Sequence, residues 1–233
     1  MIVDDVKTTG ERHEKLRKRS EIVRMLDEYE RVRRRSLGLV ASENVISPAA
    51  LRACMSDPAH RYTLPPPEER SVEIWDYPNQ LQLNRIERRL QEMAMELFGA
   101  RYVDVRPLSG NNAVFCVLAA LAGRGDRVLR VPDGCGGYFS TAPIAALRGV
   151  ELVDIPYDRE RGEVDIEALC RLHRKTRPAL VLFAASMMTF TLPLREIRSA
   201  LGREAVISYD VSHPLGIIGG GGFQNPLAGG ARI

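Results

Sequence analysis

The chain has 233 residues, 45% of them hydrophobic, which is enough for one substantial core with a small appendage. Its net charge is only +3, and basic residues near the N-terminus alternate with acidic ones, which favours a solvated helix over a nucleic-acid surface. With no long apolar run and no signal-peptide pattern, we expect a cytoplasmic protein without a membrane partner. The four cysteines are widely spaced, so we expect reduced thiols and no metal site.

The N-terminal part of the chain has the pattern of an arm. Apolar residues at helical spacing predict a long amphipathic helix over residues 11–36, docked on another subunit or lying on the surface of its own. Residues 37–41 have the pattern of a short apolar strand. Ser47 and Pro48 are expected to begin a short helix, as its N-cap and its first residue.

A long loop and a clear helix come next. Residues 56–79 are rich in Pro and charge, and loops of this length in compact domains are usually functional or disordered. The segment from Leu81 to Phe98 predicts a helix that ends at Gly99.

Beyond residue 100, strand-like and helix-like segments alternate regularly. This alternation predicts an α/β fold with a mainly parallel, doubly wound sheet, whose ligands bind beyond the carboxyl ends of the strands. The expected strands are Tyr102–Val105, Arg127–Val131, Glu151–Ile155, Ala179–Ala184 and Ala205–Tyr209, and the expected helices span residues 111–122, 139–147, 164–176 and 193–201.

Polar or aromatic side chains follow the expected strands. Asp210 ends an apolar run, with His213 three residues later, and is either a helix cap or solvated acid, or the partner of a cationic heterocycle. The stretch 109–112 is a plain helix cap or an anion site made of free backbone N–H groups. Tyr138 follows a glycine-rich turn and either packs in the core or lies against a planar ligand. Ser186 adds a polar group at the same edge of the sheet.

Lysine is rare in this chain. Of the 33 basic residues, only Lys7, Lys15, Lys18 and Lys175 are lysines. The first three lie in the charged N-terminal segment and the fourth lies late in an expected helix. None is expected at the carboxyl end of a strand.

Several motifs together resemble the serine hydroxymethyltransferase family, over residues from about 37 to 233. Leu39-Val40-Ala41-Ser42-Glu43-Asn44 matches the family's L-I-A-S-E-N, and Asp210-Val211-Ser212-His213 matches D-M-A-H. Further matches are Glu96–Ala100 with E-L-F-G-A, His60-Arg61-Tyr62 with N-K-Y, Ser109-Gly110 with the start of S-G-S-Q-A-N, Gly136-Gly137-Tyr138 with G-G-H, and Phe223–Pro226 with Y-P-N-P.

The resemblance implies pyridoxal 5′-phosphate as cofactor and the large domain of the aspartate-aminotransferase-like fold (fold type I). We accordingly divide the chain into an N-terminal arm, residues 1–36, and an incomplete cofactor-binding domain, residues 37–233. The implied roles are as follows: Asp210 pairs with the pyridine nitrogen, His213 and Ser186 flank the ring, Tyr138 stacks on it, Ser109, Gly110 and Asn111 hold the phosphate, Tyr62 reaches the phosphate of the neighbouring subunit, Ser42 lies near the substrate carboxylate, and Tyr77, aligned with the second tyrosine of R-Y-Y-G-G, belongs to the catalytic group.

The chain also departs from the family pattern. Leu64 stands where the family has its acid–base glutamate, and either Glu68 or Glu69 could substitute for it in space. Asp133 and Phe139 occupy the segment that packs folate in the family. A carboxylate facing inward beside a pterin is unfavourable, so the use of folate is doubtful.

The family's lysine segment, T-T-T-T-H-K, begins just beyond the position of Ile233, and a small domain follows it. We therefore expect the N-terminal half of a split enzyme that makes or breaks the Cα–Cβ bond of a β-hydroxy or α-substituted amino acid, by aldol, transaldol or hydroxymethyl transfer. A companion C-terminal-half chain would supply the lysine, in a dimer of heterodimers or a larger assembly. The alternatives are a regulatory or stabilising subunit of a complete homologue, and a truncated remnant without a stable fold.

Overall fold

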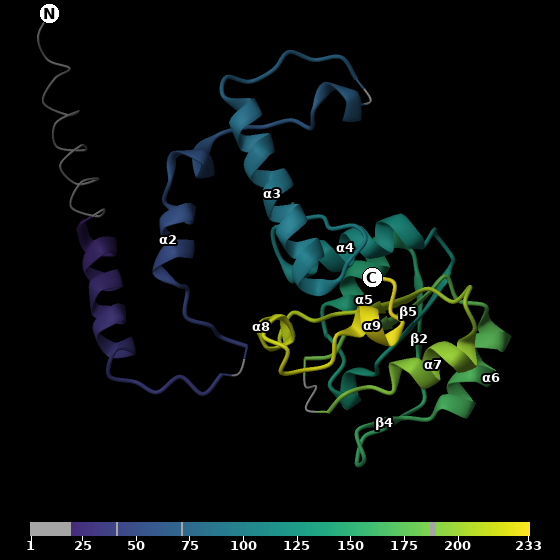
Figure 1. Ribbon diagram of the computed structural model, residues 1–233. Helices are drawn as coiled ribbons and strands as arrows, with labels where there is room; N and C mark the ends of the chain where they lie inside the picture. The colour runs from purple at the N-terminus through teal and green to yellow at the C-terminus, as the bar shows by residue number, and fades with distance from the viewer. Residues whose placement is uncertain (1–19, 41, 71, 187–189) are drawn as a thin grey trace, which may run out of the picture. The chain divides into compact units, whose positions relative to one another are not determined.

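The structure is a computed structural model that describes residues 20–40, 42–70, 72–186 and 190–233 (Figure 1). The chain divides into two units between Leu51 and Arg52, and each unit is described by itself. The functional division into an arm and a cofactor-binding domain stays a prediction.

In the first unit, residues 20–33 form a helix, as predicted for this part of the arm, while residues 11–19 lie outside the described residues. Helix α2, Pro48–Cys54, begins where expected, because the backbone N–H of Ala50 donates to Ser47 Oγ at 3.2 Å. The predicted strand at residues 37–41 is wrong for its described part, residues 37–40. These residues are exposed, and no strand in the described part of the chain lies beside them to supply a ladder of hydrogen bonds.

The second unit begins with the long loop, which is irregular apart from two short 3₁₀ turns, η1 Asp57–His60 and η2 Pro67–Glu69. Arg70 organises the later part of this loop. Its side chain is only 7% exposed, donates to the carbonyls of Pro65 and Ile74, and pairs with Asp76. The loop therefore folds around a buried guanidinium.

Helix α3, Gln80–Phe98, follows the loop and ends at Gly99, as predicted. The left-handed backbone of Gly99, at φ 65°, closes the last turn, and its N–H donates to the Met95 carbonyl. Among the described residues, no helix is both long and apolar enough to cross a lipid bilayer.

A four-stranded parallel sheet in the order β2-β1-β5-β6 forms the centre of the second unit (Figure 1). The predicted alternation of strands and helices is confirmed from residue 110 onward, with boundaries that shift by a few residues at most. The strands are β1 Arg127–Arg130, β2 Glu151–Asp154, β5 Leu180–Phe183 and β6 Ile207–Tyr209, and the helices around them are α4 Gly110–Leu121, α5 Thr141–Arg148, α6 Ile166–Thr176 and α7 Leu194–Leu201.

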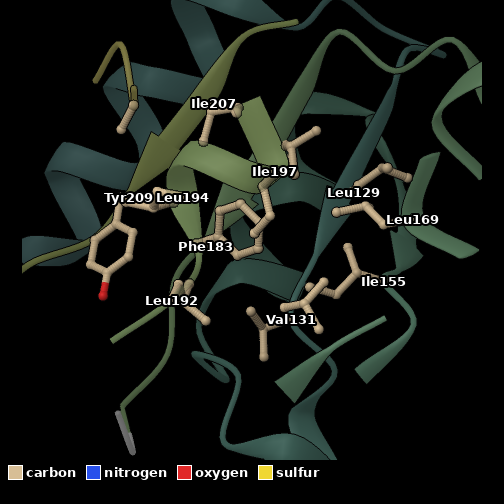
Figure 2. Packing of buried hydrophobic residues seen from close by; sticks show 13 residues of the cluster. Leu129, Val131, Ile155, Leu169, Phe183, Leu192, Leu194, Ile197, Ile207 and Tyr209 are labelled. Atoms are coloured by element: carbon tan, nitrogen blue, oxygen red, sulfur yellow. The ribbon is translucent and has the colours of Figure 1, made fainter. Parts of the chain in front are cut away.

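Helices cover both faces of this sheet, because its strands are apolar on both faces. Leu129, Phe183 and Ile207 point to one face, where they pack with residues of α6 and α7 (Figure 2). Val128 and Leu182 point to the other face and pack with residues of α4 and α5. The sheet is doubly wound, as predicted.

The predicted strand Tyr102–Val105 is wrong. Its side chains keep the alternation of exposed and half-buried positions that suggested a strand. No neighbouring strand pairs with it in the described structure, and Asp104 instead accepts hydrogen bonds from the backbone and the guanidinium of Arg106 at 2.8–3.0 Å. The sequence reading missed three short elements: the antiparallel hairpin of β3 Tyr157–Asp158 and β4 Glu163–Val164, helix α8 Leu215–Gly219, and helix α9 Pro226–Gly229.

Candidate cofactor site

The strand order places the candidate site between β1 and β5. From β1 the chain crosses to β2 on one side, and later returns to β5 on the other side. In open α/β sheets, ligands bind where the order reverses in this way, beyond the carboxyl ends of the strands. The loops that follow β1 and β5 meet at this point, because Tyr138 N–H donates to Ala184 O at 2.9 Å and Ser186 N–H donates to Gly136 O at 2.8 Å.

Asp210 follows β6 directly and is half-buried at the same edge of the sheet. Its backbone N–H donates to Phe183 O at 2.9 Å, which ties it to the end of β5. One carboxylate oxygen, Oδ1, accepts hydrogen bonds from the N–H of Ser212 at 2.8 Å and from its hydroxyl at 2.5 Å. The other oxygen, Oδ2, has no hydrogen-bond partner within the described part of the chain, so it is available to a ligand.

The N-terminus of α4 lies beside this carboxylate group. Ser109 is the N-cap, and its Oγ accepts the N–H of Asn112 at 3.2 Å. Gly110 follows, and a Cβ built there would lie 3.5 Å from Ser212 Oγ, so the first turn of α4 and the Asp210–Ser212 pair are neighbours. In the described structure the backbone N–H groups of Gly110 and Asn111 have no acceptor, as is usual at the start of a helix. Such groups attract anions.

Tyr138 reaches the site from the loop after β1. The loop turns through the 3₁₀ segment η3, Asp133–Cys135, and through Gly136 with φ 86°. At Gly137 there is no room for a side chain, since a Cβ would lie 2.3 Å from Val131 O. The Tyr138 hydroxyl donates to Asn111 Oδ1 at 2.5 Å, which joins this loop to α4.

Arg130, at the end of β1, fixes the start of the same loop. Its side chain is 13% exposed and donates to Asp133 at 2.6 and 3.1 Å and to Asp154 at 3.0 Å. Burial disfavours the charged guanidinium, but the two carboxylates outweigh it, so the pKa of Arg130 is raised. The expectation of an inward-facing Asp133 is wrong, because its side chain is 53% exposed and is neutralised by Arg130.

Several expected site residues are not joined to this group by any described contact. His213 is exposed in the turn before α8. Tyr62 and Tyr77 lie together in the long loop, with ring centroids 5.7 Å apart. Ser42 belongs to the first unit, which is not placed relative to the second.

The two candidate glutamates of the long loop occupy different pockets. Glu69 and Leu64 both line a pocket of about 320 Å³ that also contains Arg106. Glu68 lines a separate pocket of about 530 Å³ with Tyr77. Glu69 is therefore the glutamate that lines the same pocket as Leu64, and Glu68 is the glutamate that lines the same pocket as Tyr77.

Lys175 lies at the wrong edge of the sheet for cofactor chemistry. It is in the last turn of α6, which ends just before β5 begins at Leu180, so it precedes the strand whose far end contacts the site. Lys7, Lys15 and Lys18 lie outside the described residues.

Sequence reasoning missed two residues that shape the site. Ser212 was passed over as part of a motif, although a hydroxyl two residues after an acid is a recurrent local hydrogen-bonding pattern. Arg130 looked like an ordinary strand residue. Its signal was Asp133 three residues later, but the contribution of Asp154 from the neighbouring strand depends on the register of the sheet.

The sequence model of the family "Serine hydroxymethyltransferase" matches residues 16–231. Serine hydroxymethyltransferase of Pyrococcus abyssi is 33% identical over 219 residues, which are 92% of this chain and 50% of that protein. The enzyme of Picrophilus torridus is 35% identical over 212 residues, which are 90% of this chain and 48% of that protein.

A solved structure is also similar. It is L-threonine transaldolase from Pseudomonas fluorescens in its internal aldimine state, with a TM-score of 0.86 and 26% identity over 96% of this chain and 51% of that one. The match confirms the predicted fold class. The chain spans about half the length of the relatives it matches.

Proposed function

Because the chain belongs to the serine hydroxymethyltransferase family, we propose that it forms the cofactor-binding part of a pyridoxal-phosphate enzyme that acts on the Cα–Cβ bond of an amino acid. The reaction would be an aldol cleavage, a transaldol exchange or a hydroxymethyl transfer, on a β-hydroxy or α-substituted amino acid. One observation carries the proposal: the first turn of α4 and the Asp210–Ser212 pair are neighbours, since a Cβ at Gly110 would lie 3.5 Å from Ser212 Oγ.

The residues at this edge of the sheet fit pyridoxal phosphate chemically. The free N–H groups of Gly110 and Asn111, with the Ser109 hydroxyl, suit a phosphate at a helix N-terminus. The free Asp210 Oδ2 suits a protonated ring nitrogen, and a carboxylate in that place favours the protonated state. When bound, pyridoxal phosphate supplies an electron-accepting ring that stabilises negative charge at the substrate α-carbon.

The chain's own residues have distinct tasks in this scheme. Ser212 donates two hydrogen bonds to Asp210 Oδ1 and thereby fixes the orientation of the carboxylate. This orientation leaves Oδ2 for the ligand. Tyr138 provides an aromatic ring held at its hydroxyl by Asn111. His213 and Ser186 provide polar groups from the segments after β6 and β5. Tyr62, Tyr77 and Ser42 complete the set that the family membership suggests.

We further propose that the cofactor lysine belongs to a companion polypeptide that carries the C-terminal half, in a dimer of heterodimers or a larger assembly. Lys175 lies near the start of β5 and the site lies beyond its end, so Lys175 is unsuited to the role. The other three lysines belong to the charged N-terminal segment, far along the chain from the strand ends.

Borohydride reduction of the purified complex, followed by peptide mapping, tests this arrangement. Reduction locks the cofactor onto the lysine that carries it, and we expect the modified lysine on a separate, co-purifying chain. A modified Lys7, Lys15, Lys18 or Lys175 would overturn the proposal. A modified lysine in the same polypeptide, beyond residue 233, would contradict the companion chain but not the cofactor site. A modified lysine only on a full-length homologue would favour a regulatory subunit.

A further inference from the structure

A buried arginine holds the later part of the long loop before α3. The side chain of Arg70 is only 7% exposed, and each of its three nitrogens donates a hydrogen bond. Nε donates to Pro65 O at 2.5 Å, Nη1 donates to Ile74 O at 3.0 Å, and Nη2 donates to Asp76 Oδ1. The guanidinium therefore joins parts of the loop that lie on both sides of it in the chain, a task that suits its planar set of donors with fixed directions.

Asp76 connects Arg70 to the start of α3. Its Oδ1 also accepts a hydrogen bond from Gln80 Nε2 at 3.3 Å. Gln80 is the first residue of α3 and is buried, and its Oε1 accepts the backbone N–H of Tyr77 at 3.2 Å. The backbone N–H of Gln80 in turn donates to Tyr77 O at 3.1 Å. Both backbone polar groups of Tyr77 are therefore held by Gln80, and the side chain of Gln80 is held by Asp76.

The side chain of Tyr77 takes no part in this network. It is half-buried, and its ring centroid lies 5.7 Å from that of Tyr62. Within the described residues its hydroxyl has no hydrogen-bond partner. It lines the pocket of about 530 Å³ that also contains Glu68. A fixed backbone that carries a free polar side chain into a pocket is the arrangement expected of a residue that acts on a ligand.

We propose that Arg70 is a positioning residue for Tyr77, acting through Asp76 and Gln80. The inference rests on the proposed function, in which Tyr77 belongs to the catalytic group. Arg70 does not touch the substrate in this scheme, and it fixes the backbone from which the Tyr77 hydroxyl reaches the substrate. A misplacement of about 1 Å can cost about a hundredfold in rate, so a loop that is ordered before the substrate binds favours turnover.

A double-mutant cycle between Arg70 and Tyr77 tests this role. Arg70→Gln removes most of the donors, and Tyr77→Phe removes only the hydroxyl. Each should lower kcat for aldehyde release by the assembled complex by about tenfold or more, with KM nearly unchanged, because the lost contact acts in the transition state. If Arg70 acts through Tyr77, the double variant should be no slower than the slower single variant. Strictly additive losses would overturn the role.

Two controls separate positioning from a general effect on the fold. No described contact joins Tyr138 to the long loop, so Arg70→Gln and Tyr138→Phe should have additive effects at saturating cofactor. Equal coupling of Arg70 to Tyr138 and to Tyr77 would overturn the proposal. Arg171→Gln removes an exposed arginine of α6 that pairs with Glu167 of its own helix, and it should leave kcat unchanged.

Hydrogen exchange of the complex, followed by mass spectrometry, tests the network without measuring activity. Residues 72–80 should exchange faster in Arg70→Gln and in Gln80→Met, and at the wild-type rate in Arg171→Gln. Gln80→Met keeps the size of a buried side chain and removes its bonds to Asp76 and Tyr77, so it tests the same link if Arg70→Gln does not assemble. Wild-type exchange in both variants would overturn the proposal. A wild-type complex that turns over no β-hydroxy amino acid would overturn the proposed function as well, whereas turnover with additive losses would overturn only the role of Arg70.

Discussion

The Tyr138 hydroxyl donates a hydrogen bond to Asn111 Oδ1 at 2.5 Å. This contact joins the loop after β1 to the first turn of α4, two segments that meet at the reversal of strand order. In the resemblance, Tyr138 takes the place of a stacking histidine and Asn111 belongs to the phosphate loop. The structure links the two positions, so the orientation of the ring depends on a residue assigned to the phosphate.

We expect Tyr138→Phe and Asn111→Leu each to weaken binding of pyridoxal phosphate by about tenfold or less, the usual range for one hydrogen bond. Because both changes remove the same hydrogen bond, the double variant should bind pyridoxal phosphate about as tightly as the single variant with the lower affinity. Fluorescence titration of the complex with the cofactor measures the dissociation constants of the wild type, the two single variants and the double variant, and strictly additive losses would contradict the coupling.

Asp210→Asn keeps the size of the side chain and removes its charge. The Ser212 hydrogen bonds can persist, so the fold should melt at nearly the wild-type temperature. Turnover should fall by at least about a hundredfold, because a neutral amide no longer favours a protonated ring nitrogen. Ser212→Ala removes only the hydroxyl donor and should cost about tenfold. If Asp210→Asn releases aldehyde at the wild-type rate, the proposed role of Asp210 is wrong.

The sheet and its helices could be predicted from sequence because both of their faces are apolar and their periods are regular. The segment Tyr102–Val105 has an equally regular alternation of exposed and half-buried side chains. A strand also requires a neighbouring strand to pair with, and the sequence of the segment alone does not reveal whether one is present. In place of strand pairing, this segment forms a local hydrogen bond between Arg106 and Asp104. The hairpin of β3 and β4 was missed for a different reason. Its strands do pair, but each has only two residues, which are too few to show a periodic pattern.

The candidate site was predictable where a residue follows a strand directly, as Asp210 does. It was less predictable where a side chain is directed by a distant partner. Asp133 looked like an inward-facing carboxylate from its place in the chain. The register of β1 against β2 instead brings Asp154 and Arg130 together, and Arg130 holds Asp133 at the surface.

We predict turnover without tetrahydrofolate, because Leu64 stands at the position of the family's acid–base glutamate. Asp133 no longer supports it, because its carboxylate is paired with Arg130. Leu64 lacks the proton-transfer group that the family has at this position, although Glu69 lines the same pocket. Aldehyde release or exchange from β-hydroxy amino acids, with and without added tetrahydrofolate, provides the measurement. Strict dependence on tetrahydrofolate with every substrate would contradict the prediction, and Glu69→Gln would then be the next variant to assay.

Gly137→Ala should destabilise the fold by about 1–3 kcal/mol, because an added Cβ meets backbone that cannot move freely. That atom would lie 2.3 Å from Val131 O and 2.7 Å from Pro132 O. Gly134→Ala, in the same loop, is the matched control, since a Cβ there meets nothing within 4 Å. Thermal unfolding of both variants measures the difference. Equal melting temperatures would show that the loop relaxes around the new methyl group.

The last prediction concerns alkaline pH. Burial, with a smaller contribution from the Tyr157 hydroxyl, raises the pKa of Tyr209 to about 12, and its ring packs at the edge of the core cluster with the hydroxyl pointing away from the centre (Figure 2). An unfolded tyrosine loses its proton near pH 10, so between about pH 10 and 12 the unfolded state binds fewer protons than the folded state. The stability present below pH 10 should therefore be lost as pH rises through this window, by up to about 1.4 kcal/mol per pH unit from this group.

Denaturant unfolding at several pH values measures the slope of the free energy of unfolding against pH. Tyr209→Phe should fall less steeply, while the exposed control Tyr102→Phe should follow the wild type. Identical slopes for Tyr209→Phe and the wild type would show that Tyr209 does not cause the loss.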